Sequence, residues 1–107
     1  MPIDEYNRVK QIKKYINQNV AADLRATIIS EKFEVSVSTL QHLFKKYEDQ
    51  SYRHYLEDIR INKAYELITI EGKRISEAMY ATGYNNRVTF NIAFKKKFKY
   101  SPGRFRK

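Results

Sequence analysis

The stretch from Gly83 to Phe105 reads GYNNRVTFNIAFKKKFKYSPGRF, and it decides how the chain folds. A glycine opens it, where a tight turn with positive φ is expected, and Asn86 can cap the helix that follows. That helix, expected over residues 87–97, interleaves apolar and polar side chains and ends in three lysines. Ser101 and Pro102 then suit the cap and first turn of a short terminal helix. The pattern predicts a short helix behind a glycine turn, with one polar face and a basic end.

A similar pattern occurs 50 positions earlier in the chain. The matched residues are Leu40 with Phe90, Phe44 with Phe94, Lys45 and Lys46 with Lys95 and Lys96, and Ser51 with Ser101. Apolar, basic and helix-starting positions recur in one order, which indicates a duplicated structural unit. We therefore predict two helix-turn-helix copies, the first with its second helix at residues 37–47 behind a Ser36 cap. Helices of this kind suit insertion into a DNA groove.

The composition narrows the class of function. At 107 residues with 42% hydrophobic content, the chain can form one domain or two very small ones. It has no cysteine and only two isolated histidines, so we expect no metal site and no cofactor. Neither Ser36 nor Ser38 has a credible base and acid, and three glycines form no phosphate loop, so we expect no enzyme. No apolar run is long enough to span a membrane and no signal peptide is visible, which predicts a cytoplasmic protein.

The positive charge lies mostly in the second half of the chain. The net charge is +9, and residues 55–107 carry 12 basic and 5 acidic side chains, a net +7. Seven of those bases fall between Lys95 and Lys107. A basic excess alone permits binding to nucleic acid or to an anionic surface. Its coincidence with the expected helix at residues 87–97 favours nucleic acid.

Two further helices are expected in the first half. Asp4 can cap a helix to about Asn19, with Val9, Ile12, Ile16 and Val20 at helical spacing. A shorter helix, Ala26 to Phe33, is expected to place Ile28, Ile29 and Phe33 toward one side.

The best-defined helix is expected from Tyr52 to Ile70, with Ser51 as its cap and Gly72 after its end. Its predicted buried stripe is Tyr55, Leu56, Ile59, Ala64, Leu67 and Ile68. At about 1.5 Å per residue it is about 28 Å long, comparable with the ~34 Å of one DNA turn. We predict a first helix-turn-helix subdomain at residues 1–50, a linker helix at 51–71 and a second subdomain at 72–107.

The ordered motifs resemble the DNA-binding domain of the AraC/XylS family of bacterial transcription regulators over nearly the full chain. The matching residues are Ser36, Leu40, Leu43 to Lys46, Ser51, Tyr55, Leu56, Arg60, Ile61, Ala64, Leu67, Ile75, Gly83, Tyr84, Phe90, Phe94, Lys95, Ser101 and Pro102. The resemblance implies an all-α fold of about seven helices, with two helix-turn-helix units joined by a long helix. It also implies binding to adjacent major grooves of promoter or operator DNA, activation through RNA polymerase, and an upstream ligand-sensing and dimerising domain.

Several positions depart from the family pattern. Glycine is usual where this chain has Glu34, Asp49 and Lys99, so we expect those turns to be strained or differently shaped. An arginine common on each groove-entering helix aligns with His42 in the first copy and Ile92 in the second. These two departures bear on base preference and phosphate anchoring and leave the fold intact.

The candidate site residues follow from these registers. For base contacts they are Ser38, Gln41 and His42 on the first helix, and Arg87, Val88, Asn91 and Ile92 on the second. For phosphate contacts they are Ser36, Lys45, Lys46, Asn86, Thr89, Lys95 and Lys96.

These candidates have different expected roles. Gln41 can form a bidentate bond with adenine, and His42 can donate to guanine. Arg87 and Asn91, about one turn apart, are the strongest base candidates of the second copy. For Ile92, contact with a thymine methyl and packing in the core both remain open. The lysines at the helix ends favour phosphate contact, with a solvated charge run as the alternative.

The predicted function is therefore sequence-specific binding to double-stranded DNA by a transcription regulator. A weakly specific DNA binder is one alternative. A degenerate helix-turn-helix that serves as a protein-interaction module is another.

Overall fold

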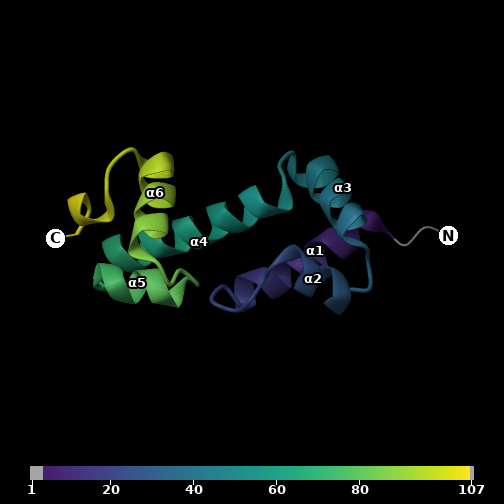
Figure 1. Ribbon diagram of the computed structural model, residues 1–107, viewed down its shortest axis with the longest axis horizontal. Coiled ribbons are helices and arrows are strands. Elements are labelled where there is room, and N and C mark those ends of the chain that lie inside the picture. The colour runs from purple at the N-terminus through teal and green to yellow at the C-terminus, as the bar shows by residue number, and fades with distance from the viewer. Residues whose placement is uncertain (1–3, 107) are drawn as a thin grey trace. The chain divides into compact units, whose positions relative to one another are not determined.

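All regular structure in the computed structural model, which describes residues 4–106, is helical (Figure 1). The helices are α1 (Glu5–Gln18), α2 (Ala26–Lys32), α3 (Val37–Glu48), α4 (Tyr52–Thr69), α5 (Ile75–Ala81) and α6 (Arg87–Phe98), followed by a 3-10 turn, η1 (Pro102–Arg104). The described residues contain no strand, so the predicted all-α class is confirmed. No helix within residues 4–106 combines the length and the apolar character needed to span a bilayer.

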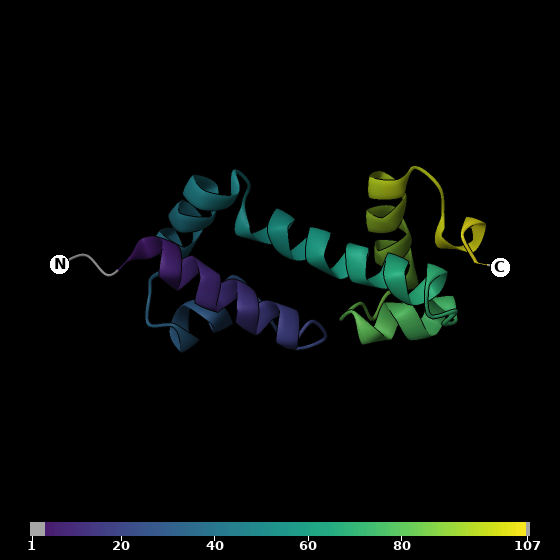
Figure 2. The same ribbon diagram turned by 180° about the vertical axis from the view of Figure 1, so that it is seen from behind.

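The chain forms two compact units, the first ending at Leu56 and the second beginning at Glu57. This division falls within α4, which is one continuous helix from Tyr52 to Thr69 (Figure 2). The first turn of α4 therefore belongs to the first unit and the remainder to the second.

Side chains cap the helices where the sequence predicts. At α1, Asp4 Oδ1 accepts a hydrogen bond from the backbone N–H of Asn7 at 3.3 Å. At α4, Ser51 Oγ accepts from the backbone N–H of His54 at 3.1 Å. Each bond satisfies one of the N–H groups that the first turn of a helix leaves without an intrahelical acceptor.

In the first unit, α1 and α2 both pack against α3. The buried hydrophobic residues of this unit are Val9, Ile12, Ile16, Leu24, Ile29, Leu40, Leu43, Phe44, Tyr52 and Tyr55. Phe44 lies at the centre of an aromatic group, 5.1 Å from the ring of Tyr52 and 5.1 Å from that of Tyr55. The buried hydroxyl of Tyr52 donates to the Leu24 carbonyl at 2.7 Å, so Tyr52 is a core residue with a satisfied polar end.

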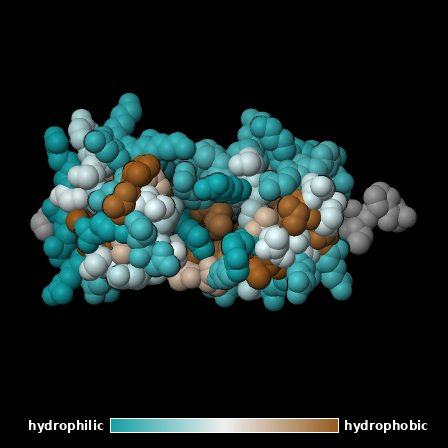
Figure 3. Space-filling model, in the orientation of Figure 1, coloured by the Kyte–Doolittle hydropathy of each residue, from teal (hydrophilic) through white to brown (hydrophobic). Residues whose placement is uncertain are grey.

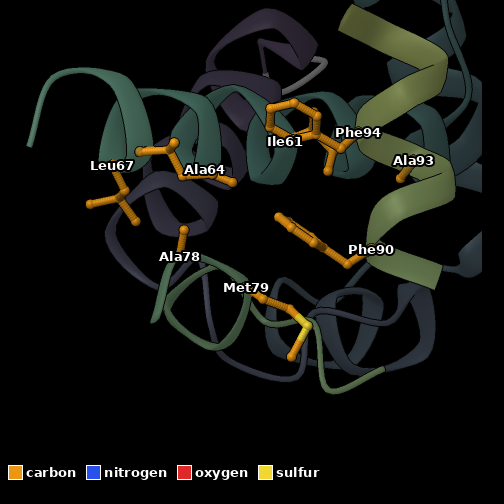
Figure 4. Packing of buried hydrophobic residues seen from close by; sticks show 9 residues of the cluster. Ile61, Ala64, Leu67, Ala78, Met79, Phe90, Ala93 and Phe94 are labelled. Atoms are coloured by element: carbon orange, nitrogen blue, oxygen red, sulfur yellow. The ribbon is translucent and has the colours of Figure 1, made fainter. Parts of the chain in front are cut away.

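In the second unit, side chains from α4, α5 and α6 meet between the three helices (Figure 4). The buried residues are Ile61, Ala64, Leu67, Ile68, Ala78, Met79, Phe90, Ala93 and Phe94. Phe94 contacts the rings of Tyr65, Phe90, Phe98 and Phe105, at centroid distances of 5.0 to 6.4 Å. The terminal η1 segment thus closes this core through Phe105, and Pro102 occupies the predicted first position of the turn.

Three residues other than glycine adopt the left-handed backbone conformation. Glu34 and Asp49 both have φ of 56°, and Lys99 has φ of 73°. These are the positions at which the resemblance implies glycine. The turns have kept the left-handed shape, so the departure from glycine introduces backbone strain at a cost of about 1–2 kcal/mol per residue. Gly83, with φ of 91°, confirms the predicted glycine turn of the second copy.

Two expectations about buried faces are wrong in part. Ile28 is 40% exposed while Ile29 is fully buried, because consecutive helical residues point about 100° apart and cannot share one side. In α4, four residues of the predicted stripe are buried, namely Tyr55, Ala64, Leu67 and Ile68. Leu56 and Ile59 are only half-buried, and Ile61, which the stripe did not include, is buried. A single stripe does not describe α4, because the helix contributes to two separate cores.

Candidate nucleic-acid interface

The turn before α3 is held by hydrogen bonds from two directions. The backbone N–H of Val35 donates to the Ser30 carbonyl at 3.0 Å, and Arg8 Nη1 donates to the Phe33 carbonyl at 2.6 Å. Ser36 Oγ then accepts from the backbone N–H of Thr39 at 3.0 Å, which confirms the predicted cap. These bonds fix the direction in which α3 leaves the turn.

The outward face of α3 is polar and carries every first-copy candidate for a base contact. Ser38, Gln41 and His42 are exposed. At about 100° per residue, positions 38 and 42 lie opposite the buried side of the helix. This arrangement leaves hydroxyl, amide and imidazole groups accessible to a bound ligand.

The turn before α6 follows the same plan. The backbone N–H of Tyr84 donates to the Met79 carbonyl at 3.0 Å, and Gly83 occupies a left-handed conformation. The guanidinium of Arg60 lies over Gly83, so close that a Cβ at this position would lie 2.9 Å from Arg60 Cζ. Asn86 Oδ1 accepts from the backbone N–H of Thr89 at 3.0 Å, which confirms the second predicted cap.

Burial at this turn also affects Tyr84. Desolvation of its hydroxyl raises the pKa of Tyr84 to about 12, and the nearby carboxylate of Glu57 contributes in the same direction. Tyr84 is therefore neutral at physiological pH and acts as a packing residue, with its ring 5.3 Å from that of Phe90.

The outward face of α6 has an aliphatic centre. Val88 is 67% exposed and Ile92 is 64% exposed. They stand one turn apart on the side opposite Phe90 and Phe94. The sequence left two alternatives open for Ile92, core packing and contact with a thymine methyl group. Its exposure rules out core packing. Arg87, as predicted, is also exposed.

Asn91, a leading candidate for a base contact, is less accessible than such a contact requires. The residue is half-buried, and its Oδ1 is enclosed without a hydrogen-bond donor among the residues that the structure describes. In this orientation the side chain cannot present its amide oxygen to a base. A bidentate bond to adenine would require the amide to rotate, because that bond uses both its oxygen and its nitrogen.

The lysines at the ends of α3 and α6 fall into two classes. Lys46 Nζ lies 2.9 Å from Glu5 Oε1, Lys96 Nζ lies 3.9 Å from Glu57 Oε1, and Lys97 Nζ lies 3.2 Å from Asp58 Oδ1. Lys45 and Lys95 are exposed and form no ion pair with any residue between positions 4 and 106. A phosphate group would therefore meet a carboxylate as competitor at Lys46 and Lys96 but not at Lys45 and Lys95.

The ion pair between Glu5 and Lys46 shifts the pKa of both groups. The hydrogen bond from Lys46 lowers the pKa of Glu5, and a second bond from the Tyr47 hydroxyl, at 3.1 Å, lowers it further. The same interaction raises the pKa of Lys46. Both groups remain charged at neutral pH.

Sequence reasoning missed these carboxylates as members of the surface. A shift of 52 positions aligns Glu5 with Glu57 and Arg8 with Arg60. That register relates α1 to the second part of α4, so the duplication also extends to the helix that precedes each helix-turn-helix. The signal was present in the chain but is offset by two positions from the shift of 50 that relates α3 to α6.

Comparison with known proteins gives one matching family model. The model, described as "Helix-turn-helix domain", matches residues 29–107. Among curated proteins, the Msm operon regulatory protein of Streptococcus mutans is 31% identical over 99 residues, covering 92% of this chain and 36% of that protein. The HTH-type transcriptional activator RhaS of Salmonella schwarzengrund is 23% identical over 95 residues, covering 89% of this chain and 34% of that protein. The chain thus spans about a third of the length of these relatives.

Solved structures agree on the fold. The C-terminal domain of AraT, a response regulator from Geobacillus stearothermophilus, is 31% identical, with a TM-score of 0.87 and coverage of 92% of this chain and 83% of that one. The C-terminal domain of the two-component response regulator yesN from Fusobacterium nucleatum has a TM-score of 0.87 at 24% identity, covering 94% of this chain and 99% of that one. The second likeness supports the fold alone.

Proposed function

We propose a function from one premise: the chain belongs to the AraC-type helix-turn-helix family. It binds double-stranded DNA in a sequence-specific manner. The helices α3 and α6 each enter a major groove, and the two grooves are successive ones on the same site.

The observation that carries this proposal is the matched construction of α3 and α6. Each helix has 12 residues and begins at a side-chain cap whose oxygen accepts from a threonine N–H three residues later. Each then buries an apolar stripe that ends in a phenylalanine, Phe44 in α3 and Phe94 in α6, and leaves an exposed face that ends in lysines. Two helices of this design in 107 residues with a net charge of +9 fit an anionic polymer with a repeating groove.

The exposed side chains suit distinct parts of DNA. Gln41 can form two hydrogen bonds with adenine, His42 can donate to guanine, and Arg87 can form a bidentate bond with guanine. Lys45 and Lys95 bind phosphates, as do the backbone and side-chain donors near Ser36 and Asn86 at the helix starts. The phosphate contacts set the register, and the base contacts set the sequence preference.

For the whole protein we propose a cytoplasmic transcription regulator that acts on promoter or operator DNA. Activation by contact with RNA polymerase is supported by the name of RhaS, which is called a transcriptional activator. Because this chain spans about a third of such relatives, further domains that bind a ligand and dimerise belong to the same proposal.

Selection of bound sites from random duplex DNA tests this function. We expect the 107-residue chain to enrich a site with two separated conserved segments. Gln41→Ala should relax preference in one segment and Arg87→Ala in the other, each by about 1–3 kcal/mol. Gln11→Ala, which changes an exposed glutamine on α1, serves as the matched control and should change neither.

The other outcomes separate the alternatives. Binding that unrelated DNA competes away fully indicates a weakly specific binder. Loss of preference at the same bases in both variants contradicts the assignment of one groove to each helix. Absence of any mobility or spectral change with DNA favours a protein-interaction module.

A further inference from the structure

The outward side of α6 is unusual for a surface that meets a polar polymer. Its centre is the pair Val88 and Ile92, exposed by 67% and 64%, and separated by one helical turn. At about 100° per residue their directions differ by about 40°, so they form one short ridge. We call these two residues the aliphatic ridge.

The aliphatic ridge is surrounded by positive charge. Arg87 precedes it, and Lys95 follows one turn later on the same side. The exposed Lys96 lies beside it. A protein partner that buried only this ridge would have to cover these cations, whereas a DNA groove supplies phosphates to them. Figure 3 shows that hydrophobic surface on the face in view is broken into small areas among hydrophilic residues. A larger apolar patch would be expected of a protein-docking face.

Asn91, the polar residue beside the aliphatic ridge, does not supply a hydrogen-bond acceptor on this face of α6. Asn91 points its Oδ1 into an enclosed position where it accepts no hydrogen bond from the described residues. The central part of the helix surface therefore offers methyl and methylene groups where the equivalent positions of α3, Ser38 and His42, offer polar groups.

We propose that α6 recognises thymine through its C5-methyl group, by contact with the aliphatic ridge. In the major groove the thymine methyl is the only apolar group that a base pair presents, and aliphatic side chains contact it favourably. This proposal rests on the proposed function. It adds that the half-site bound by α6 contains thymine whose methyl group contributes to affinity. The half-site bound by α3 should not depend on thymine methyl groups, because the equivalent residues of α3, Ser38 and His42, are polar.

Deoxyuridine provides the direct test, because it differs from thymidine only by the missing methyl group. The probe is the duplex selected by the 107-residue chain, with the α6 half-site identified by the bases whose preference changes in Arg87→Ala. Replacing each thymine in that half-site by deoxyuridine should weaken binding about fourfold for each methyl group that is buried. The same replacement in the α3 half-site should leave affinity within twofold.

Protein variants then show whether the ridge is the partner of the methyl group. Ile92→Ala and Val88→Thr each remove part of the aliphatic surface of the ridge, so each should reduce the difference in affinity between thymine and deoxyuridine duplexes. Ile70→Ala is the matched control, because Ile70 is 78% exposed and lies just beyond the end of α4. It should keep the full difference between the two duplexes. Far-ultraviolet circular dichroism should show unchanged helicity in all three variants, since each residue is exposed.

Each remaining outcome overturns the proposal. The proposal is wrong if the selected α6 half-site contains no thymine. It is also wrong if the wild-type chain keeps its sequence preference but binds the thymine and deoxyuridine duplexes with equal affinity. A methyl dependence that is undiminished in both Ile92→Ala and Val88→Thr assigns the contact to other residues. If the ridge instead mediates self-association, sedimentation should show a dimer that Ile92→Ala dissociates. Failure to select any DNA sequence rejects the proposed function itself and is distinguishable from all of these.

Discussion

The outward faces of α3 and α6 occupy equivalent positions in two repeats, yet their chemistry differs. Ser38 and His42 stand in α3 where Val88 and Ile92 stand in α6. The caps, the buried phenylalanines and the first lysine after them are alike in both helices. Folding constrains the caps and the buried phenylalanines, because a cap and a core position each contribute to the stability of the fold. The outward residues have none, so they are where the two repeats can acquire different ligands.

The two turns share a backbone shape but differ in the residue at the left-handed position. Arg8 donates to the Phe33 carbonyl in the first unit, and Arg60, at the equivalent position, lies over Gly83 in the second. The residue equivalent to Gly83 is Glu34, which adopts the same left-handed conformation without the advantage of glycine. One backbone shape thus occurs with glutamate in the first unit and with glycine in the second, and the same backbone hydrogen bond closes both turns.

The largest effect should come from removing the central aromatic residue of each core. Phe44→Ala and Phe94→Ala should each destabilise its own unit by about 3–5 kcal/mol. Phe94 should lie at the upper end, because four rings surround it compared with two around Phe44. Urea unfolding followed by circular dichroism measures both. Tyr80→Ala, at an exposed site on α5, is the control and should cost less than 1 kcal/mol, roughly the range of surface changes. Equal losses for the two phenylalanines would contradict the difference drawn between the cores.

The next effect sharpens the comparison of the turns. Gly83→Ala should cost about 1–3 kcal/mol, because it combines positive φ with displacement of the Arg60 side chain. Gly72→Ala isolates the conformational part, since Gly72 has φ of 68° and open space around its Cβ position. Gly103→Ala, where neither condition applies, should be close to neutral. Thermal unfolding of the three variants ranks them, and an equal cost at Gly83 and Gly72 would mean that the position of Arg60 contributes nothing.

A smaller effect should separate the two classes of lysine. Lys45→Gln and Lys95→Gln should each reduce the slope of log affinity against log salt by about 0.9, the loss of one phosphate contact. Lys97→Gln should change the slope little, because Asp58 already pairs with Lys97 at 3.2 Å. DNA titrations between low and moderate salt, on specific and scrambled duplexes, measure the slope. An unchanged slope in Lys95→Gln would support a solvated charge run, and an altered sequence preference would assign Lys95 to the bases.

Much of the fold could be predicted from local patterns. The caps at Asp4, Ser36, Ser51 and Asn86 and the glycine turn at Gly83 are each specified within a few residues. Such signals depend only on backbone geometry and the short reach of a side chain, so a single sequence contains them.

What the patterns did not predict depends on tertiary contacts. The burial of Tyr52 requires the Leu24 carbonyl, which is 28 residues away along the chain. The change of buried residues along α4 follows from its part in two cores, which periodicity within one helix cannot show. On the candidate site, residue types and helix register were predictable. The enclosed amide oxygen of Asn91 and the carboxylates beside the lysines were not, because both depend on how neighbouring helices pack.

The smallest expected effect concerns the carboxylates that the two repeats share. Glu5 hydrogen-bonds Lys46 at 2.9 Å, whereas the Glu57 and Lys96 charges are 3.9 Å apart. Glu5→Gln should therefore lower stability slightly at neutral pH, and Glu57→Gln should lower it less. Exposed pairs contribute little in water.

The pH dependence of the Glu5 effect has a definite sign. Because the hydrogen bond from Lys46 lowers the pKa of Glu5 in the folded state below its unfolded value, the unfolded state binds more protons in the interval between the two pKa values. The contribution of the pair to stability is thus complete above the unfolded value and disappears as pH falls through the folded value. Unfolding of the wild-type chain and Glu5→Gln should therefore differ at pH 7 and converge in acid. In DNA titrations both Gln variants should bind more tightly than the wild type, because each change removes a negative charge and releases a lysine toward phosphate. Weaker binding in either variant would mean that the carboxylate holds its lysine in the binding position, and would end the view that it competes with DNA.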